Sequence, residues 1–491
     1  MKYILALDQS TQGTKAMLLD EKGERCGRIS LPHEQIILSN GYVEHNPEEI
    51  YHNVIEVVRM LLEKSGVRGD QIMGAGISNQ RETALAWDRN TGRSFGNAVV
   101  WQCGRGEAIC RRIEAAGHAQ AVQQKTGLRL SPYFSAAKIA WILENREDAR
   151  EAAAKGDFLC GTMDSYLIFR LSGGEEFRTD VSNASRTQLM NLETLSWDPE
   201  LCGWYGIRPE MLPQITDSDA LFAMTDFEGV LDHPIPIHGV LGDSHAALFG
   251  HGCRRPGQMK TTYGTGSSIM MNIGEKPVWS QKGLVTSLAW KVGGKAQYVL
   301  EGNINYTGAV MTWAVKDLGL IESASQADEM ALAAAENDTT YIVPAFTGLG
   351  APYWDTDAKA MIYGMGRQTG RAELIRAVDE CIAYQVADIV YLMQEESGFP
   401  LEEVRADGGA SRGEFLMQFQ SDLLNTPVYA AENEEISGTG AGLAAGFGLG
   451  MYTDSVFEGR QYRAYRPQMT EERRKQKYDG WKDAVKRVLM K

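Results

Sequence analysis

The sequence predicts an α/β protein in which two domains repeat one fold. A chain of 491 residues is longer than the roughly 250 to 300 residues at which a single hydrophobic core stops growing. Strand-like and helix-like segments alternate in both halves, which is typical of layered α/β folds. A turn rich in hydroxyls and glycine follows a strand at residues 8–15 and again at residues 263–268. We therefore expect two domains, residues 1–250 and 251–491, with one architecture.

The first half opens with strands. Short runs of apolar and β-branched residues between glycine and polar residues predict strands. They lie at residues 3–7, 15–19, 25–31, 72–78 and 83–87. A helix interrupts this series, so the segment reads as an α/β layer.

That helix is expected to start at Pro47. Asn46 can cap its first turn, Pro47 suits the first helical position, and Glu49 can complete a capping box. Apolar residues then recur at helical spacing over residues 50–62. This period predicts one buried helix face.

The second half repeats the scheme. Hairpin-like strands are expected around residues 259–272 and 285–301, and a long helix over residues 371–397. The buried face of this helix is predicted to consist of Leu374, Ile375, Val378, Ile382, Val386, Ile389, Val390 and Met393. No Pro/Ser-rich linker separates the halves, so we place the boundary near residue 250 and expect closely packed domains that move about a hinge.

Composition narrows the class of ligand and the compartment. No segment approaches the roughly 18 apolar residues of a membrane span, and the start lacks the pattern of a signal peptide, so we expect a cytoplasmic protein without membrane insertion. Seven cysteines without a C-x-x-C pair predict free thiols and no structural zinc. A formal charge of -15 argues against nucleic-acid partners.

The two turns are suited to an anion. Backbone N–H groups and hydroxyls can converge there, because glycine leaves no Cβ in the way. Since the overall charge is negative, local donors and a metal must hold such a ligand. Two of these turns predict a duplicated fold that grips one phosphate chain.

Motifs along almost the entire chain resemble the FGGY carbohydrate kinases, most closely the glycerol kinases among them. They are DQSTQGTK at residues 8–15, SNQRET at 78–83, VWQC at 100–103, YFSAAKIAW at 133–141, NASRT at 183–187, GD at 242–243, YGTG at 263–266, PAFTGLGAPYW at 344–354, ADGG at 406–409 and FLMQFQSD at 415–422. One short match would be weak, whereas this ordered series is specific. The resemblance implies two actin-like, ribonuclease H-like ATPase domains, with ATP and a polyol meeting in the interdomain cleft.

The first turn is expected to serve metal and phosphate. A carboxylate at a strand end can hold Mg²⁺, and the hydroxyls after it can reach phosphate oxygens. We assign Asp8 to Mg²⁺ and Ser10, Thr11, Thr14 and Lys15 to the phosphates. An ordinary acidic β-turn would use the same residue types. Lys15 stands where glycerol kinases usually carry arginine, which replaces a planar bidentate donor by a point charge.

Asp243 is the predicted general base. Transfer of a phosphoryl group to an alcohol requires a carboxylate that orients the hydroxyl and accepts its proton. Asp243 follows an apolar strand and precedes a helix start, so a helix N-cap is the alternative interpretation. The family match favours the base, which we also assign as a second Mg²⁺ ligand.

Four residues are expected to bind the polyol by resemblance. Arg81 can donate two hydrogen bonds to adjacent hydroxyls, Glu82 can accept one, and Trp101 and Tyr133 can cover the C–H side. Without the resemblance, Arg81 and Glu82 would be interpreted as a surface ion pair. The two aromatic residues would be interpreted as part of the hydrophobic core.

The second half is expected to supply most contacts to ATP. Gly264, Thr265 and Gly266 match the turn that holds the β- and γ-phosphates. The remaining predicted nucleotide contacts are Gly308, Thr312, Gly408, Gly409 and Gly413. The later glycine-rich segment 438–446 is interpreted instead as close helix packing.

Two serines depart from the glycerol kinase pattern. Ser244 replaces a glutamine that contacts substrate, and Ser268 replaces a phenylalanine against the glycerol carbons. Both changes enlarge the expected substrate pocket. Loss of the aromatic wall should weaken binding of a three-carbon substrate by on the order of 1–3 kcal/mol.

The sequence thus predicts ATP-dependent phosphorylation of a primary hydroxyl of a small polyol, with glycerol as the leading substrate. An erythritol, xylulose or ribulose kinase is the alternative within the family. A non-catalytic ATP- and sugar-binding sensor and an actin-like chaperone ATPase are alternatives of other classes. The sensor predicts loss of Asp8 or Asp243, and the chaperone predicts an added peptide-binding domain. We also expect a homo-oligomer, either dimer or tetramer.

Overall fold

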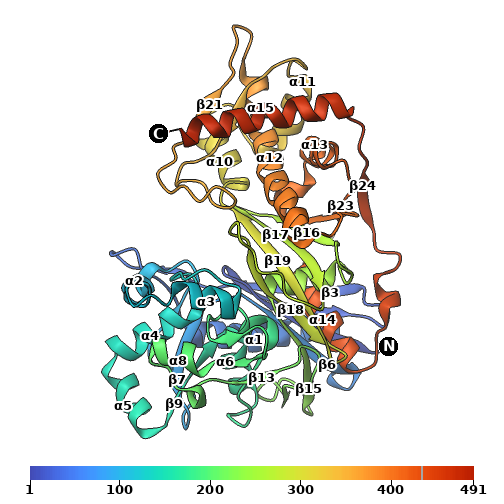
Figure 1. The fold of residues 1–491 in the computed structure, drawn as a ribbon. Helices are drawn as coiled ribbons and strands as arrows, with labels where there is room; N and C mark the ends of the chain where they lie inside the picture. Colours follow the sequence, from blue (N-terminus) through green and yellow to red (C-terminus); the bar gives the residue numbers. More distant parts are fainter. Residues whose placement is uncertain (433–434, 491) are drawn as a thin grey trace.

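The computed structural model describes residues 1–432 and 435–490. Figure 1 shows a lower lobe formed mainly by the first half of the chain and an upper lobe that carries α10–α13 and α15. A mixed sheet forms the centre of each half.

The first sheet has six strands in the order β14-β15-β6-β1-β2-β3. Their bounds are β1 (Tyr3–Gln9), β2 (Gly13–Leu19), β3 (Arg25–Pro32), β6 (Ile72–Asn79), β14 (Ala223–Thr225) and β15 (Ile235–Gly242). β1, β2 and β3 form an antiparallel meander, and β6 and β15 lie parallel to β1 beside it. The carboxyl ends of β1, β6 and β15 therefore meet at one edge.

The second sheet repeats this arrangement in the order β18-β19-β17-β16-β22-β23-β24. Its strands are β16 (Met259–Tyr263), β17 (Ser267–Gly274), β18 (Val285–Val292), β19 (Lys295–Ile304), β22 (Val404–Asp407), β23 (Val428–Ala431) and β24 (Tyr462–Tyr465). β16, β17 and β19 are antiparallel, and β22 and β23 lie parallel to β16. The predicted duplication is thus present in the topology.

The remaining strands form smaller, separate sheets. A five-stranded sheet in the order β4-β5-β8-β7-β9 extends the lower lobe, and three strand pairs lie elsewhere. Their bounds are β4 (Ile36–Ile37), β5 (Val43–His45), β7 (Ala84–Asp88), β8 (Ala98–Val99), β9 (Phe158–Thr162), β10 (Arg178–Asp180), β11 (Met190–Asn191), β12 (Ser196–Trp197), β13 (Gln214–Thr216), β20 (Tyr341–Val343) and β21 (Met361–Tyr363).

The helices cover these sheets. They are α1 (Pro47–Ser65), α2 (Glu107–Ala115), α3 (Ala119–Thr126), α4 (Ser135–Asn145), α5 (Glu147–Lys155), α6 (Met163–Leu171), α7 (Val181–Ala184), α8 (Pro199–Tyr205), α9 (Asp243–Gly250), α10 (Gly308–Lys316), α11 (Ala327–Ala333), α12 (Arg371–Ser397), α13 (Glu414–Leu424), α14 (Ile436–Gly448) and α15 (Glu471–Leu489). α12 has the predicted bounds, and its predicted face is buried except for the half-buried Leu374.

The start of α1 is confirmed in part. Asn46 accepts from the backbone N–H of Glu48 at 3.0 Å, and Pro47 occupies the first turn. The predicted capping box is wrong, because the Glu49 carboxylate accepts from the backbone N–H of Glu34 at 3.2 Å instead. Glu49 thereby ties the helix to the loop after β3.

Helix α14 comes from the C-terminal part of the chain but packs on β1, β6 and β15 of the first sheet. Its glycines allow this approach, since a Cβ on Gly440 would lie 1.8 Å from the carbonyl oxygen of Ala246 in α9. This geometry agrees with the packing role predicted for residues 438–446. Because α14 crosses back, the domain boundary near residue 250 stays a proposal.

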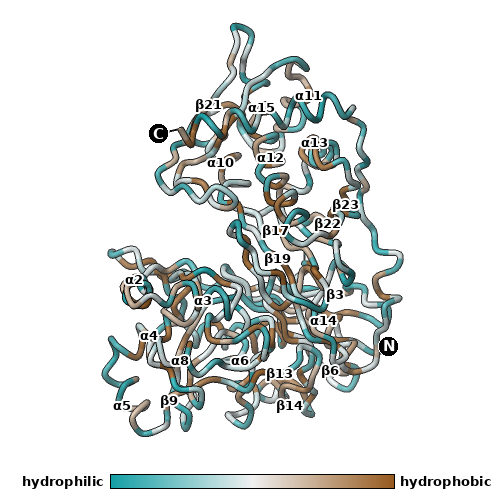
Figure 2. The backbone as a smooth tube through the Cα atoms, in the orientation of Figure 1, coloured by the Kyte–Doolittle hydropathy of each residue, from teal (hydrophilic) through white to brown (hydrophobic). Residues whose placement is uncertain are grey.

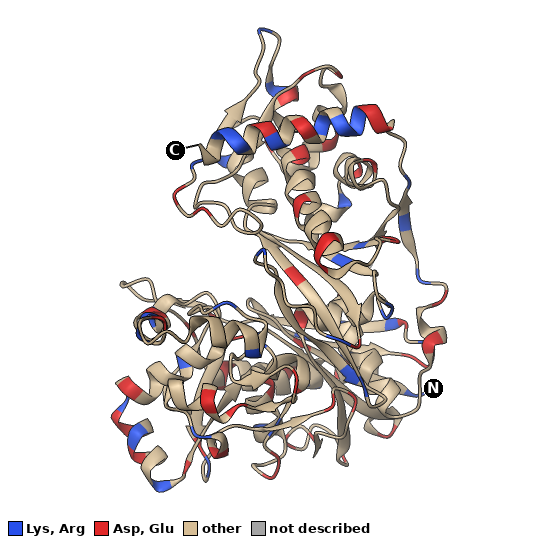
Figure 3. Cartoon of the chain, viewed as in Figure 1, with Lys and Arg blue, Asp and Glu red and all other residues tan. Residues whose placement is uncertain are grey.

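Hydropathy and charge follow the layers. Apolar residues concentrate in the central strands and in α12 (Figure 2), whereas the outer helix α15 carries charges of both signs (Figure 3). All seven cysteines are free thiols, as predicted. Within the described residues, no helix is both long and apolar enough to cross a membrane. Against this apolar interior, a few charged side chains of the central strands are buried, among them Asp8, Lys260 and Glu301.

Candidate active site

Asp8 lies at the edge where β1, β6 and β15 end. Its carboxylate accepts from the Ser78 hydroxyl at 2.9 Å and from the Lys15 ammonium at 3.2 Å. Lys15 also contacts Glu435 at 2.8 Å. Burial lowers the pKa of Lys15, but the two carboxylates outweigh this effect and raise it. Lys15 is therefore a fixed cation paired with Asp8 rather than a free arm of the turn.

The hydroxyls of the first turn have different partners. The Ser10 hydroxyl donates to the carbonyl of Gly13 at 3.0 Å, and the Thr11 hydroxyl accepts from the Trp101 indole at 3.0 Å. The buried Thr14 hydroxyl has no hydrogen-bond partner among the described residues. Of these three hydroxyls, Thr14 is thus the one that forms no hydrogen bond with the described residues.

The second turn lies against the start of α10. The N–H of Gly308 donates to the carbonyl of Gly264 at 2.9 Å, and the N–H of Thr307 donates to that of Thr265 at 3.0 Å. Gly264 and Thr265 are exposed. Thr312 is not aimed at this turn, because its hydroxyl donates to the carbonyl of Gly308 in its own helix at 2.9 Å.

A third glycine segment joins this region. Gly408 has a φ of 92°, and a Cβ there would lie 2.5 Å from the carbonyl oxygen of Tyr263, which immediately precedes the turn. A Cβ on Gly409 would meet nothing within 4 Å, and Gly413 is the N-cap residue of α13. The structure therefore brings together the glycine segments predicted to bind ATP.

Asp243 stands at the first turn of α9, beside the end of β6. Its carboxylate accepts from the backbone N–H of Ser244 at 2.6 Å and from Nε of Arg81 at 3.1 Å. Its side chain is 33% exposed. Burial raises the pKa of Asp243, Arg81 opposes the rise, and Asp8 adds to it. The strand register places both aspartates at the same edge of the first sheet.

Arg81 and Glu82 form part of a buried charge network. Arg81 donates two terminal N–H bonds to Glu301, at 2.9 and 2.8 Å. Arg186 donates to Glu82 at 2.5 Å and contacts Glu301 at 2.8 Å. Arg81 is 5% exposed and Glu82 is 2% exposed. The two predicted polyol ligands are therefore neither a surface pair nor paired with each other.

Trp101 and Tyr133 lie edge to face with ring centroids 5.6 Å apart. The loop that carries Tyr133 is held by the buried ammonium of Lys138, which donates to the carbonyls of Pro132, Tyr133 and Phe134. Burial lowers the pKa of Lys138 to about 7. The predicted aromatic pair is thus assembled, and Lys138 fixes its loop.

Ser268 lies next to the charge network, whereas the Ser244 side chain forms no hydrogen bond with the described residues of that network. The Ser268 hydroxyl donates to Glu301 at 3.4 Å and accepts from the Lys260 ammonium at 3.3 Å. Ser244 adjoins the network through its backbone bond to Asp243. Ser268 therefore contacts the same Glu301 oxygen that accepts from Arg81.

Sequence reasoning missed Arg186, Lys260 and Glu301 as site residues. Lys260 and Glu301 are fully buried in β16 and β19. Lys260 follows Met259 in β16, and Glu301 follows Val299 and Leu300 in β19, so each charge adjoins apolar strand residues. A buried charge is rarely present without a partner. That pattern is the signal by which the two residues could have been found.

A cavity of about 720 Å³ reaches this network from the space between the lobes. Tyr133, Arg186 and Glu301 are among the residues that line it. Arg129 and Trp354 also line it, and the Arg129 guanidinium lies 4.6 Å from the ring centroid of Trp354, so residues of both halves meet at the cavity. The cavity gives a small polar molecule a route to the network.

Family comparison agrees with this arrangement. Models of the N-terminal and C-terminal domains of the FGGY family of carbohydrate kinases match residues 3–250 and 259–449. The chain belongs to the FGGY family of carbohydrate kinases. As an FGGY kinase it is an ATP-dependent phosphotransferase, and the predicted actin-like two-domain fold is confirmed.

Individual FGGY kinases are similar over the full length. Glycerol kinase 1 of Thermotoga maritima is 47% identical, over 99% of this chain and 99% of that protein. A glycerol kinase of Xanthomonas campestris is 43% identical, over 99% of this chain and 98% of that protein. The crystal structure of Plasmodium falciparum glycerol kinase with ADP has a TM-score of 0.95 at 35% identity, covering 100% of this chain and 99% of that one.

Proposed function

We propose that this FGGY kinase transfers the γ-phosphoryl group of ATP to a primary hydroxyl of glycerol, giving glycerol 3-phosphate. The observation that carries this proposal is the convergence of Asp8, Asp243 and Arg81 at one sheet edge. The similarity to proteins named glycerol kinase supports glycerol as the acceptor.

Asp243 acts in this proposal as the general base. Its hydrogen bonds from Arg81 and Ser244 engage the same oxygen, Oδ1. They orient the carboxylate, and Oδ2 can accept the proton of the attacking hydroxyl. Since phosphoryl transfer depends mainly on positioning and charge stabilisation, an oriented carboxylate suffices for this step.

The remaining groups of the network would bind the polyol. The guanidinium of Arg81 has five N–H donors, and three of them are used by Asp243 and Glu301. The other two, with the second carboxylate oxygen of Glu82, can address adjacent hydroxyls. Trp101 and Tyr133 would cover the C–H side of the substrate.

The set of acidic groups fits Mg²⁺. Among the described residues, no group of three His, Cys, Asp or Glu side chains could hold a metal. Mg²⁺ typically binds through one or two carboxylates plus waters and phosphates. Asp8 and Asp243 would hold it, and the ion would neutralise charge on the phosphates. Ser10, Thr11 and Thr14 would contact the same phosphates from the first turn.

ATP itself would bind mainly to the second half. The exposed Gly264 and Thr265 and the half-buried Gly266 would bind the β- and γ-phosphates, and Gly308 adjoins them. The open surface at Gly409, between Gly408 and Gly413, suits the nucleoside. Thr312 would contribute through position only, since its hydroxyl is used within α10.

A longer polyol or ketose is the second candidate. Ser268, which contacts Glu301, is smaller than the phenylalanine of the glycerol kinase pattern at this position. The cavity of about 720 Å³ also lies in the range of about 300–1,000 Å³ that accommodates drug-sized ligands. Erythritol, xylulose and ribulose are the acceptors that would use this space.

The test is ADP release from Mg-ATP with glycerol, dihydroxyacetone, erythritol, threitol, xylitol, xylulose or ribulose, and with no acceptor. Turnover highest with glycerol supports the proposal. If turnover is highest with a longer acceptor, that acceptor and not glycerol is the substrate. Equal turnover without acceptor favours a chaperone-like ATPase, and binding without any turnover favours a sensor.

Cytoplasmic location and assembly into a dimer or tetramer stay predictions. The assembly can be tested by light scattering.

A further inference from the structure

Glu301 is a carboxylate without exposed surface in the middle of the site. It comes from β19 of the second sheet, whereas the two arginines that bind it come from the first half. One oxygen accepts from Arg81 and, at 3.4 Å each, from Ser268 and Asn303. The other accepts from Arg81 and contacts Arg186. Both oxygens of Glu301 are thus fully engaged by donors.

The pairs form one chain of alternating charge. It runs from Glu82 through Arg186 to Glu301, and on through Arg81 to Asp243. Each arginine therefore bridges Glu301 and one residue proposed to touch the substrate. Glu301 is the central member and the only one of the three carboxylates in the second half.

This arrangement fixes the direction of Arg81. A bidentate contact with a carboxylate sets the plane of a guanidinium as well as its position. With the fork on Glu301, only Nε faces Asp243. Without that contact the fork could turn onto Asp243 and occupy the oxygen needed by the acceptor hydroxyl. Arg186 would likewise lose the partner that holds it against Glu82.

We propose that Glu301 is the positioning residue of the polyol site: it holds Arg81 and Arg186 so that Asp243 and Glu82 remain available to the substrate. Because Glu301 belongs to the second half, the polyol site is completed only when the two halves are in contact. This inference rests on the proposed function, since it assigns the arginines to acceptor binding.

The variant Glu301→Gln tests the proposed positioning role of Glu301. Glutamine keeps the shape but has one acceptor oxygen, and its NH₂ group would face an arginine donor. We expect the KM for the acceptor to rise at least tenfold and kcat to fall at least tenfold, while the KM for ATP changes less than twofold. Glu301→Asp retains the charge, so it should recover a large part of the acceptor KM.

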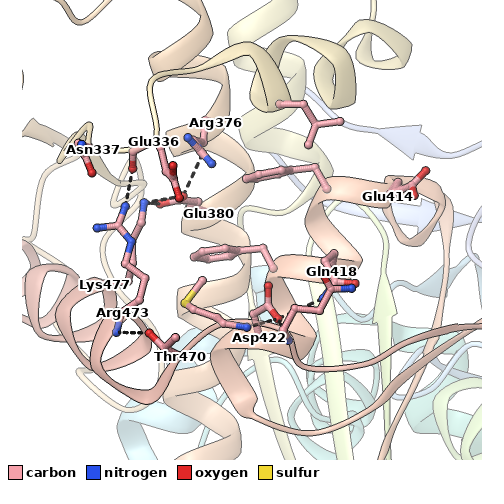
Figure 4. Close-up of a pocket in the computed structure, with 15 residues that line it drawn as sticks. Glu336, Asn337, Arg376, Glu380, Glu414, Gln418, Asp422, Thr470, Arg473 and Lys477 are labelled. Carbon is pink, nitrogen blue, oxygen red and sulfur yellow. Dashed lines mark hydrogen bonds and ion pairs between the residues drawn. The ribbon is translucent and has the colours of Figure 1, made fainter.

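Glu380→Gln is the matched control. Glu380 is also a buried carboxylate of the second half that holds two cations, Lys477 at 2.7 Å and Arg376 at 3.4 Å. Figure 4 shows these three residues at the wall of a separate cavity of about 770 Å³. Loss of the Glu380 carboxylate should lower the melting temperature of the protein without changing the KM for the acceptor.

The outcomes are distinct. An acceptor-specific defect in Glu301→Gln, absent from Glu380→Gln and relieved in Glu301→Asp, supports the positioning role. Equal defects in both glutamine variants, or equal effects on the KM for ATP and acceptor, would show that Glu301 is only structural. A wild-type protein without acceptor-dependent turnover would overturn the proposed function and this inference together.

Discussion

Glu82 has a backbone φ of 58°, in the left-handed region that residues other than glycine rarely adopt. Such a conformation costs on the order of 1–3 kcal/mol and persists only where the surroundings impose it. Here the Ser135 hydroxyl donates to the Glu82 carbonyl at 3.1 Å, and Arg186 holds its carboxylate. Backbone strain is therefore present at a proposed substrate ligand, and two side chains of the first half hold it there.

Asp243→Asn should separate catalysis from nucleotide binding. An amide cannot accept the acceptor proton, and general base catalysis contributes about 10²- to 10⁴-fold to rates. We expect kcat to fall by at least about 10²-fold, measured by coupled ADP release. The affinity for ATP without Mg²⁺, measured by calorimetry, should be nearly unchanged because the glycine segments of the second half supply most of the proposed nucleotide contacts. Near wild-type turnover would show that another group takes the proton.

Ser268→Phe should shift substrate preference toward glycerol. A ring beside Glu301 would fill space that a longer acceptor needs, and burying apolar area of this kind is worth about 1–3 kcal/mol. We expect the ratio of kcat/KM for glycerol to that for erythritol to rise about tenfold. Ser268→Ala, which removes the hydroxyl without adding a ring, is the control. An unchanged ratio in the phenylalanine variant would mean that position 268 does not contact the acceptor.

At the scale of elements, α9 and α14 pack backbone to backbone. A Cβ on Gly440 would lie 1.8 Å from the Ala246 carbonyl, and one on Gly250 would lie 2.6 Å from the Ile436 carbonyl. Asp243 begins α9. The packing of a C-terminal helix therefore fixes the helix that carries the proposed base.

Gly440→Ala should lower both stability and turnover. An added methyl group in a closely packed contact costs about 1–3 kcal/mol or more, and moving α9 displaces Asp243. Melting temperature and kcat measure the two effects. Gly203 in α8 is the control, since a Cβ there meets nothing within 4 Å. Gly203→Ala should stabilise by up to about 1 kcal/mol through helix propensity; equal destabilisation by both variants would contradict this account.

At the scale of the whole molecule, buried histidines link stability to pH. His33 and His45 have ring centroids 4.6 Å apart. Burial lowers the pKa of both, that of His45 to about 3. The folded protein keeps them neutral, while the unfolded chain takes up protons below about 6.5. Folding stability should therefore decrease as the pH falls from about 6.5 toward 3.

His33→Phe should reduce this acid sensitivity. Both ring nitrogens of His33 are buried and have no hydrogen-bond partner among the described residues, so phenylalanine removes a protonation site without removing a side-chain bond. We expect a smaller loss of melting temperature between pH 8 and pH 5 than in wild type. His52→Phe changes an exposed histidine of α1 and should keep the wild-type slope. Parallel slopes for all three proteins would exclude His33 as the source.

Local patterns determined much of this molecule. The periodicity of α12, the cap at Asn46, the strand–turn–strand units and the motif series follow from residues near one another in the chain. They were sufficient for the two-domain α/β fold, for the family and for the set of candidate residues around Asp8, Arg81 and Asp243.

The pairing of charges was decided only by the tertiary structure. Nothing in the local sequence shows that Arg81 binds Glu301, that Lys15 binds Glu435, or that α14 returns to the first sheet, since each contact joins distant segments. A local pattern reports which groups a segment exposes or buries. Which buried charges neutralise each other depends on how the two sheets come together, because burial without a partner is too costly to persist.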